Sequence, residues 1–236
     1  MYIKTKAIVL SIIKYNDNGA VLKAYTDQTG FTTYFIRNFF KSRKFKKALF
    51  QPNALLELLA SHKDKGQMEH IKEAHVLYHY KNLHVDYNKL NVSTFLREIL
   101  LESLKNEQAD KELFGFIYNK FVQLDTRDFH PDFHLIFMLE LSKYLGFFPD
   151  IQTQGKYFDM HNGFFTDEIP PFQYLNKEDT NLFNNFLGTI FAVKNIIKIS
   201  HKDRNKVLNI LLDFYHLHIE QFNRPKSVKV LHKIYD

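Results

Sequence analysis

The order of strand-like segments in the first third of the chain most constrains how this sequence can fold. Five segments there are rich in β-branched and aromatic residues, which favour strands. Clusters of Asn, Asp and Gly, typical of tight turns, separate the first three segments, and a longer connector separates the third from the fourth. The predicted strands are Thr5–Tyr15, Ala20–Thr26, Phe31–Phe39, Asn53–Ser61 and Gly66–Tyr78.

Three strands, a connector and two further strands form the element order of the OB-fold. This fold is a five-stranded barrel whose open face and flanking loops bind single-stranded nucleic acid. Closure of the barrel would also remove the exposed strand edges that short strands otherwise present. An SH3-like or other small barrel without a ligand is the alternative on element order alone.

The positive charge of the chain is concentrated in the same segment. Residues 1–80 carry 13 Lys and Arg against 6 Asp and Glu, a net charge of +7, whereas residues 81–236 carry 19 against 20, a net charge of −1. A basic domain beside a nearly neutral one is typical of a module that binds a polyanion. We therefore predict a nucleic-acid-binding domain over residues 1–80 and a second domain over residues 81–236.

The connector between the third and fourth predicted strands holds much of this charge. Its five basic residues would contact phosphate, with Lys23 and Arg37 as second-rank contacts. Three aromatic rings are candidates for stacking on bases: Tyr15, Tyr25 and Phe40. The alternative for the connector is a solvated loop, and for each ring it is core packing, which we predict for Phe31 and Phe35. The basic residues of the connector are Lys41, Arg43, Lys44, Lys46 and Lys47.

After Tyr80 the apolar period changes from two to between three and four, which predicts an all-helical second domain. The third of its helices is the best marked, with Pro131 at the first helical position and Gly146 as the C-terminal cap. Asn162-Gly163 predicts the turn of a small β-hairpin inserted between helices. The other predicted helices are Leu90–Leu104, Ala109–Leu124, one from about Lys177, Lys202–Phe222 and Lys226–Tyr235.

Nothing in the sequence indicates an enzyme, a metal site or a cofactor. The chain has no cysteine, which excludes disulfides, Cys-ligated zinc and a thiol nucleophile. It also has no GxxxxGK[ST] or GxSxG motif, and no apolar run approaches the roughly 18 residues that span a bilayer, so a soluble cytoplasmic protein is expected. Four pairs of close residues lack the spacing or neighbours of a metal or catalytic site: His130/His134, His216/His218, Asp125/Asp128 and Asp167/Glu168.

Several short segments, taken in order, resemble the bacterial RecO family of recombination mediators and DNA repair proteins. In the first domain the likeness runs through the opening strand, the turn that ends at Gly19, and the basic connector with Leu49-Phe50-Gln51-Pro52. No single segment is specific, but together they cover almost the whole chain. The remaining matches are Tyr25-Thr26, Gly30, Leu55-Leu56-Glu57, Leu139-Glu140-Leu141, Leu145-Gly146-Phe147 with Pro149, Tyr215-His216-Leu217-His218 and Lys226-Ser227-Val228-Lys229-Val230-Leu231.

The resemblance implies an OB-fold followed by a helical domain, and a protein that binds single- and double-stranded DNA and anneals complementary strands. It also implies partnership with RecR and with the C-terminal tail of the single-strand-binding protein, to help load RecA, and a cytoplasmic protein associated with the nucleoid during repair. Many members hold zinc with four cysteines after the Leu-Gly motif, but Ile151–Thr166 has none, so this chain is expected to be zinc-less. Some members have Gly where Asn38 stands, and Asn tolerates the left-handed conformation.

We therefore predict a non-enzymatic DNA-binding mediator. The rival hypothesis is a protein-interaction module whose basic barrel binds an acidic peptide tail without direct DNA binding.

Overall fold

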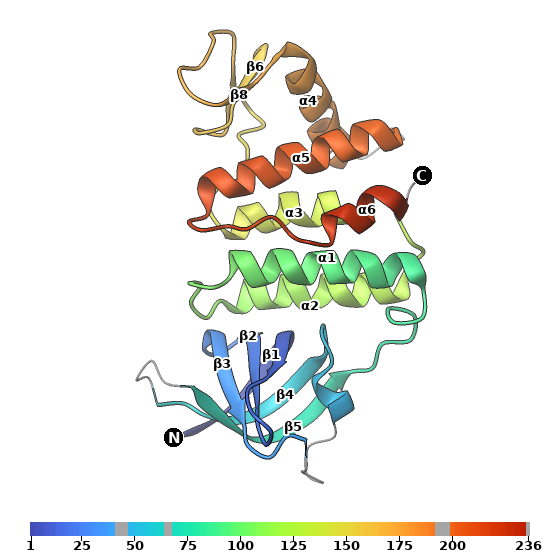
Figure 1. Cartoon of the computed structure of the whole chain (residues 1–236). Coiled ribbons are helices and arrows are strands. Elements are labelled where there is room, and N and C mark those ends of the chain that lie inside the picture. Colours follow the sequence, from blue (N-terminus) through green and yellow to red (C-terminus); the bar gives the residue numbers. More distant parts are fainter. Residues whose placement is uncertain (41–46, 64–67, 192–198, 235–236) are drawn as a thin grey trace. The chain divides into compact units, whose positions relative to one another are not determined.

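The computed structural model describes residues 1–40, 47–63, 68–191 and 199–234 (Figure 1). The chain divides into two compact units. The first unit comprises Met1–Phe129 with Pro225–Ser227, and the second comprises His130–Arg224 with Val228–Asp236. The first two helices thus group with the barrel. Whether residues 1–80 fold as a separate domain stays a prediction.

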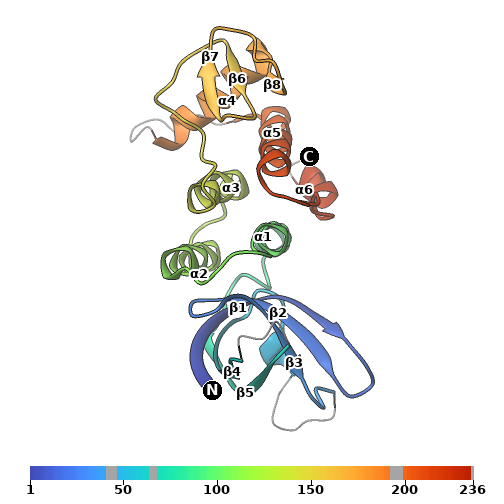
Figure 2. The ribbon, with the colours of Figure 1, turned by 90° about the vertical axis from the view of Figure 1, so that its left-hand side faces the viewer.

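The first unit contains a closed five-stranded barrel, which confirms the predicted fold class. The strands follow one another around the barrel in the order β1-β2-β3-β5-β4, and β4 pairs with β1 to close it (Figure 2). All neighbouring strands are antiparallel except β3 and β5, which are parallel. The elements are β1 (Tyr2–Lys14), β2 (Ala20–Thr26), β3 (Gly30–Ile36), the 3₁₀ helix η1 (Lys47–Phe50), β4 (Leu55–Ser61) and β5 (Glu69–Tyr78).

The barrel core is built from the inward faces of all five strands together with Phe39 and Phe50. On β3 the inward residues are Tyr34 and Ile36, so the prediction that Phe31 and Phe35 pack in the core is wrong. Bulky residues occupy both faces of the segment from Phe31 to Ile36, so the alternation of residues does not show which face points into the barrel. The buried core comprises Ala7, Val9, Ala20, Leu22, Ala24, Tyr34, Ile36, Phe39, Phe50, Leu56, Leu58, Ala60 and Ile71.

Helices α1 (Tyr87–Ser103) and α2 (Lys111–Thr126) form a hairpin that packs beside the barrel within the first unit. The loop between them receives the β2–β3 turn, where the amide of Phe31 donates to the carbonyl of Glu107 at 3.2 Å. Gly30 makes this approach possible, because its φ is 65° and an added Cβ would lie 2.4 Å from that same carbonyl. The outer side of this turn is therefore covered by protein.

A buried carboxylate connects the end of the barrel to this helical hairpin. Asp125, near the end of α2, is fully buried and accepts hydrogen bonds from three consecutive backbone amides just after β5. Burial alone would raise the pKa of Asp125, but these hydrogen bonds outweigh it and hold the pKa below its usual range. The donors are Lys81 N at 3.0 Å, Asn82 N at 2.7 Å, Leu83 N at 2.7 Å and the Tyr78 hydroxyl at 2.9 Å.

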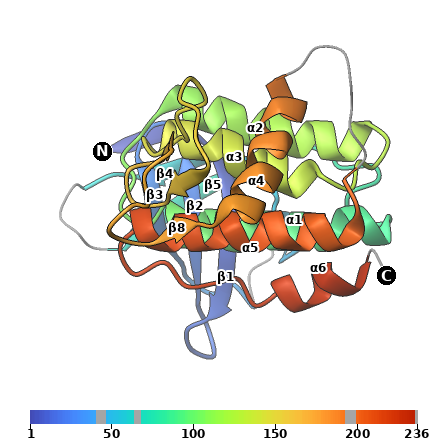
Figure 3. The ribbon, with the colours of Figure 1, turned by 90° about the horizontal axis from the view of Figure 1, so that it is seen from above.

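In its described residues, the second unit contains four helices and a small sheet. The third predicted helix is present, but Pro131 is not its first helical residue: Asp132 is the N-cap and the helix begins at Phe133. Gly146 has a φ of 82°, and the amides of Gly146 and Phe147 donate back to Lys143 and Ser142, which is the predicted glycine cap. The helices, seen from above in Figure 3, are α3 (Phe133–Tyr144), α4 (Lys177–Phe191), α5 (His201–His218) and α6 (Val228–Ile234).

The predicted hairpin is present as β6 (Tyr157–Asp159) and β7 (Phe164–Thr166), and β8 (Tyr174–Leu175) extends it to three strands. Gly163 in its turn has a φ of 71°, as the Asn-Gly pair predicts. The inward ring of Phe158 packs at 5.1 Å from Phe183 of α4 and at 5.7 Å from Phe214 of α5. Aromatic packing thus holds this sheet on the helices.

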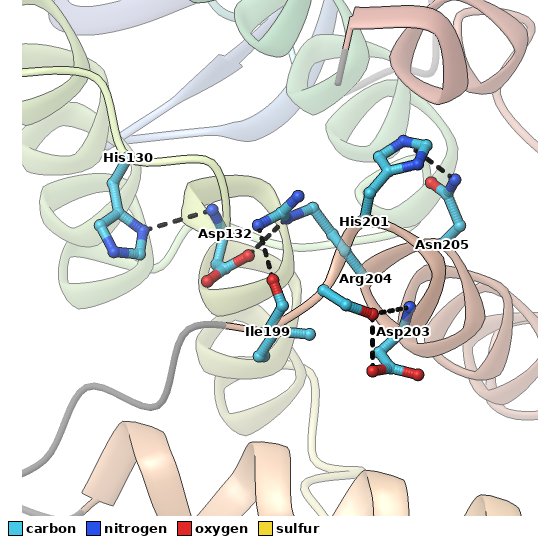
Figure 4. A network of polar contacts seen from close by, with 8 residues as sticks. His130, Asp132, Ile199, His201, Asp203, Arg204 and Asn205 are labelled. Carbon is cyan, nitrogen blue, oxygen red and sulfur yellow. Dashed lines mark hydrogen bonds and ion pairs between the residues drawn. The ribbon is translucent and has the colours of Figure 1, made fainter. Parts of the chain in front are cut away.

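An ion pair lies inside the second unit, between the start of α3 and α5 (Figure 4). The Nε atom of Arg204 donates to Oδ1 of Asp132 at 2.6 Å, and each side chain is only 10% exposed. The guanidinium also donates to the carbonyl of Ile199 at 3.3 Å. Because both charged groups are largely shielded from water, each is stabilised mainly by the opposite charge of its partner.

Candidate nucleic-acid interface

The predicted phosphate contacts fall into two groups. Lys41, Arg43, Lys44 and Lys46 lie outside the described residues. The other three are placed on the barrel: Lys23 is half-buried on β2, Arg37 is exposed just after β3, and Lys47 begins η1. The described elements on either side of the connector are β3 before it and η1 after it, and both belong to the first unit.

Phe40 stands at the entry to this connector with two cations beside it. Its ring is 36% exposed, and the Nζ atoms of Lys47 and Lys14 lie 5.1 and 6.0 Å from its centroid. The ring packs edge-on against Phe39 at 5.2 Å, and Phe39 is anchored in the barrel core. Asn38 adopts a φ of 54°, the left-handed conformation anticipated for that position. A fixed ring with neighbouring cations suits contact with a base and its phosphate.

Tyr25 must be withdrawn from the stacking candidates. It is fully buried, and its hydroxyl donates to the carbonyl of Gln108 at 3.1 Å in the loop between α1 and α2. Burial raises the pKa of Tyr25 to about 12. The prediction failed because β2 presents Tyr25 on the same outward face as Lys23, but the helical hairpin covers that end of the strand. A base cannot reach the ring.

Tyr15 belongs to a row of three rings that sequence reasoning did not assemble. Tyr15 itself is 60% exposed. Its ring centroid lies 5.7 Å from that of Phe35 on β3, and Phe35 lies 6.0 Å from His70 on β5, both edge-on. The three residues come from the β1–β2 turn, β3 and the start of β5, so no local sequence pattern could link them. The parallel pairing of Phe35 with His70 creates the row.

The β1–β2 turn is shaped to support this row. The amide of Tyr15 donates to the carbonyl of Gly19 at 3.0 Å, which closes the turn. An added Cβ at Gly19 would lie 2.6 Å from the Phe35 ring, so the missing side chain leaves the space that the ring fills. The Nδ1 atom of His70 lies 3.2 Å from the carbonyl oxygen of Phe35, which fixes the far end of the row.

Two lysines follow or precede members of the row in the chain, Lys14 before Tyr15 and Lys72 after His70. The Nζ atom of Lys14 lies 2.8 Å from Oδ1 of Asp17. This ion pair is exposed to solvent and contributes little to stability. Lys72 is exposed two residues after His70, with its Nζ atom 5.4 Å from the ring of Tyr2. Lys14 therefore lies near both groups of rings, because it directly precedes Tyr15 and its Nζ atom is 6.0 Å from the ring centroid of Phe40.

The described residues, 1–40, 47–63, 68–191 and 199–234, give no sign of a metal site or a membrane span. Within those residues, no three His, Asp or Glu side chains come together in a group that could hold a metal ion. None of the helices in the described segments is long and apolar enough to cross a membrane.

Comparison with known proteins gives a consistent set of matches. The family model "Recombination protein O N terminal" matches residues 1–80, and "Recombination protein O C terminal" matches residues 84–157. Proteins named "DNA repair protein RecO" from Christiangramia forsetii and Flavobacterium psychrophilum are 38% and 37% identical to this chain, over 100% of both chains in each case. The protein of the same name from Bacteroides fragilis is 29% identical over 99% of both chains.

Proposed function

Because the chain belongs to the RecO family of DNA repair proteins, we propose that it is a non-enzymatic mediator that binds single- and double-stranded DNA and anneals complementary strands. With RecR, it would help load RecA onto DNA covered by the single-strand-binding protein, whose C-terminal tail it would contact. It would act in the cytoplasm, at the nucleoid during repair. The net charge of +7 over residues 1–80, carried by a closed barrel, is the main support for DNA binding.

Annealing follows physically from charge neutralisation. Two complementary strands repel one another through their phosphates, and Lys and Arg side chains that neutralise phosphate reduce this repulsion. Contacts to phosphate carry no sequence information, so Watson–Crick pairing alone would decide which strands remain together. A basic barrel that holds two strands without reading base edges would therefore accelerate annealing.

The dependence of binding on salt tests the proposed phosphate contacts. If all five basic residues of the connector contact phosphate, the logarithm of the affinity for a single-stranded oligonucleotide should fall with the logarithm of salt concentration at a slope of roughly −3.5. Fluorescence anisotropy at several salt concentrations measures this slope. Reversing Lys44, Lys46 and Lys47 to Glu should weaken binding strongly and flatten the slope.

A matched variant reverses three exposed lysines outside the barrel: Lys202, Lys226 and Lys229. It makes the same change in net charge and should retain most of the affinity. A slope near zero for the wild type, or full binding by the connector variant, would contradict the proposal. Binding of an acidic peptide without binding of DNA would instead support the rival interaction module.

A further inference from the structure

We propose that Tyr15, Phe35 and His70 form a base-stacking row that makes the barrel prefer single strands to duplex DNA. This inference rests on the proposed DNA-binding function and assigns one part of it to a particular place. The basic connector would neutralise phosphate on either form of DNA, and the row would add affinity for unpaired bases alone.

The geometry supports a preformed platform. Successive centroid separations of 5.7 and 6.0 Å place the three rings in contact across the barrel surface. Phe35 lies in the middle, half-buried against Gly19, and supports the other two rings. We assign it a positioning role, because Tyr15 is 60% exposed and offers the larger free surface. Rings that are already fixed lose little conformational freedom when a base stacks on them.

The chemistry of the two forms of DNA explains the selectivity. In a duplex the faces of the bases are stacked on one another, so a protein ring cannot reach them without unstacking a base pair. In a single strand the faces are available, and every base has one, so stacking tolerates any sequence. Lys14, which directly precedes Tyr15 in the chain, is placed to meet a phosphate of such a strand.

The absence of tryptophan from this chain allows a direct test. Tyr15→Trp introduces a single indole at the exposed end of the row. A base that stacks on it should quench its fluorescence when oligothymidine is added, whereas a hairpin duplex of mixed sequence should leave the fluorescence unchanged. Tyr87→Trp is the control, because Tyr87 is 67% exposed at the first residue of α1, outside the barrel strands and the ring row, and should not be quenched by either ligand.

Affinity measurements complete the test. Tyr15→Ala should weaken binding of oligothymidine by about 5- to 150-fold, the range for losing one stacked base, and leave duplex affinity unchanged. Tyr15→Phe, which keeps the ring, should retain both affinities, as should Tyr87→Ala. Equal losses for the two forms of DNA, or an indole at position 15 that is not quenched by bound oligothymidine, would overturn the stacking row while the proposed DNA binding stands. A wild-type protein that binds neither form would overturn both.

Discussion

Replacing Asp125 by alanine should lower the free energy of unfolding of the first unit by about 3 to 5 kcal/mol, because it leaves several donors buried without an acceptor. The carboxylate accepts from the amides of Asn82 and Leu83, each at 2.7 Å, and from the hydroxyl of Tyr78 at 2.9 Å. Denaturant unfolding followed by circular dichroism measures the loss. Asp128→Ala, an exposed aspartate three residues later, is the control and should change stability by less than about 0.5 kcal/mol.

Acid should remove the same contribution in the wild type. The pKa of Asp125 in the folded protein lies below its usual range, so its stabilising effect is fully present above the unfolded value of about 3.9. That effect is lost progressively as the pH falls through the lower, folded pKa. The stability difference between the wild type and Asp125→Asn should therefore shrink as the solution is acidified below about pH 4. A difference that is constant down to pH 2 would refute this role for the carboxylate.

Removing one partner of the ion pair between Asp132 and Arg204 should cost the second unit about 3 to 5 kcal/mol, because it strands a buried charge. The double variant Asp132→Ala with Arg204→Met should be markedly more stable than Asp132→Ala alone, since no isolated charge remains. Thermal unfolding of the two single variants and the double variant gives the coupling energy directly.

A second ion pair in the same unit provides the comparison. Arg224 pairs with Asp213, but their side chains are 46% and 42% exposed. Asp213→Ala should therefore cost less than about 1 kcal/mol. If Asp132→Ala and Asp213→Ala lowered the free energy of unfolding equally, burial of the pair between Asp132 and Arg204 would not explain its contribution to stability.

The sequence predicted the barrel well because its signals are local. Turn clusters such as Asn18-Gly19 and alternating β-branched residues mark each strand where it occurs, and β2 was predicted with its observed bounds. The β6–β7 hairpin followed from Asn162-Gly163 in the same way. Strand β8 was missed because it has only two residues, and its pairing with β6 comes from tertiary structure.

The candidate interface was predicted only in part, because exposure depends on what covers each face. Tyr25 and Tyr15 look equally suitable in the sequence, yet the loop after α1 buries one and leaves the other open. Asp125 was considered only as half of a carboxylate pair, and its hydrogen bonds were not predicted, because its donors lie more than 40 positions earlier in the chain. Such pairings are set by topology, which periodicity and spacing do not report.

The ring row crosses the place where the barrel is closed by the fewest strand pairings. Among the residues that the structure describes, β3 and β5 meet through two residue pairs, Tyr34 with Glu69 and Phe35 with His70, whereas the other neighbouring strands share six or seven. This short junction is where the barrel should open most readily. A single strand of DNA that stacks on Phe35 and His70 would contact both β3 and β5 and would hold the two strands together. Amide hydrogens along β3 and β5 should then exchange more slowly when the protein holds oligothymidine than when it holds duplex.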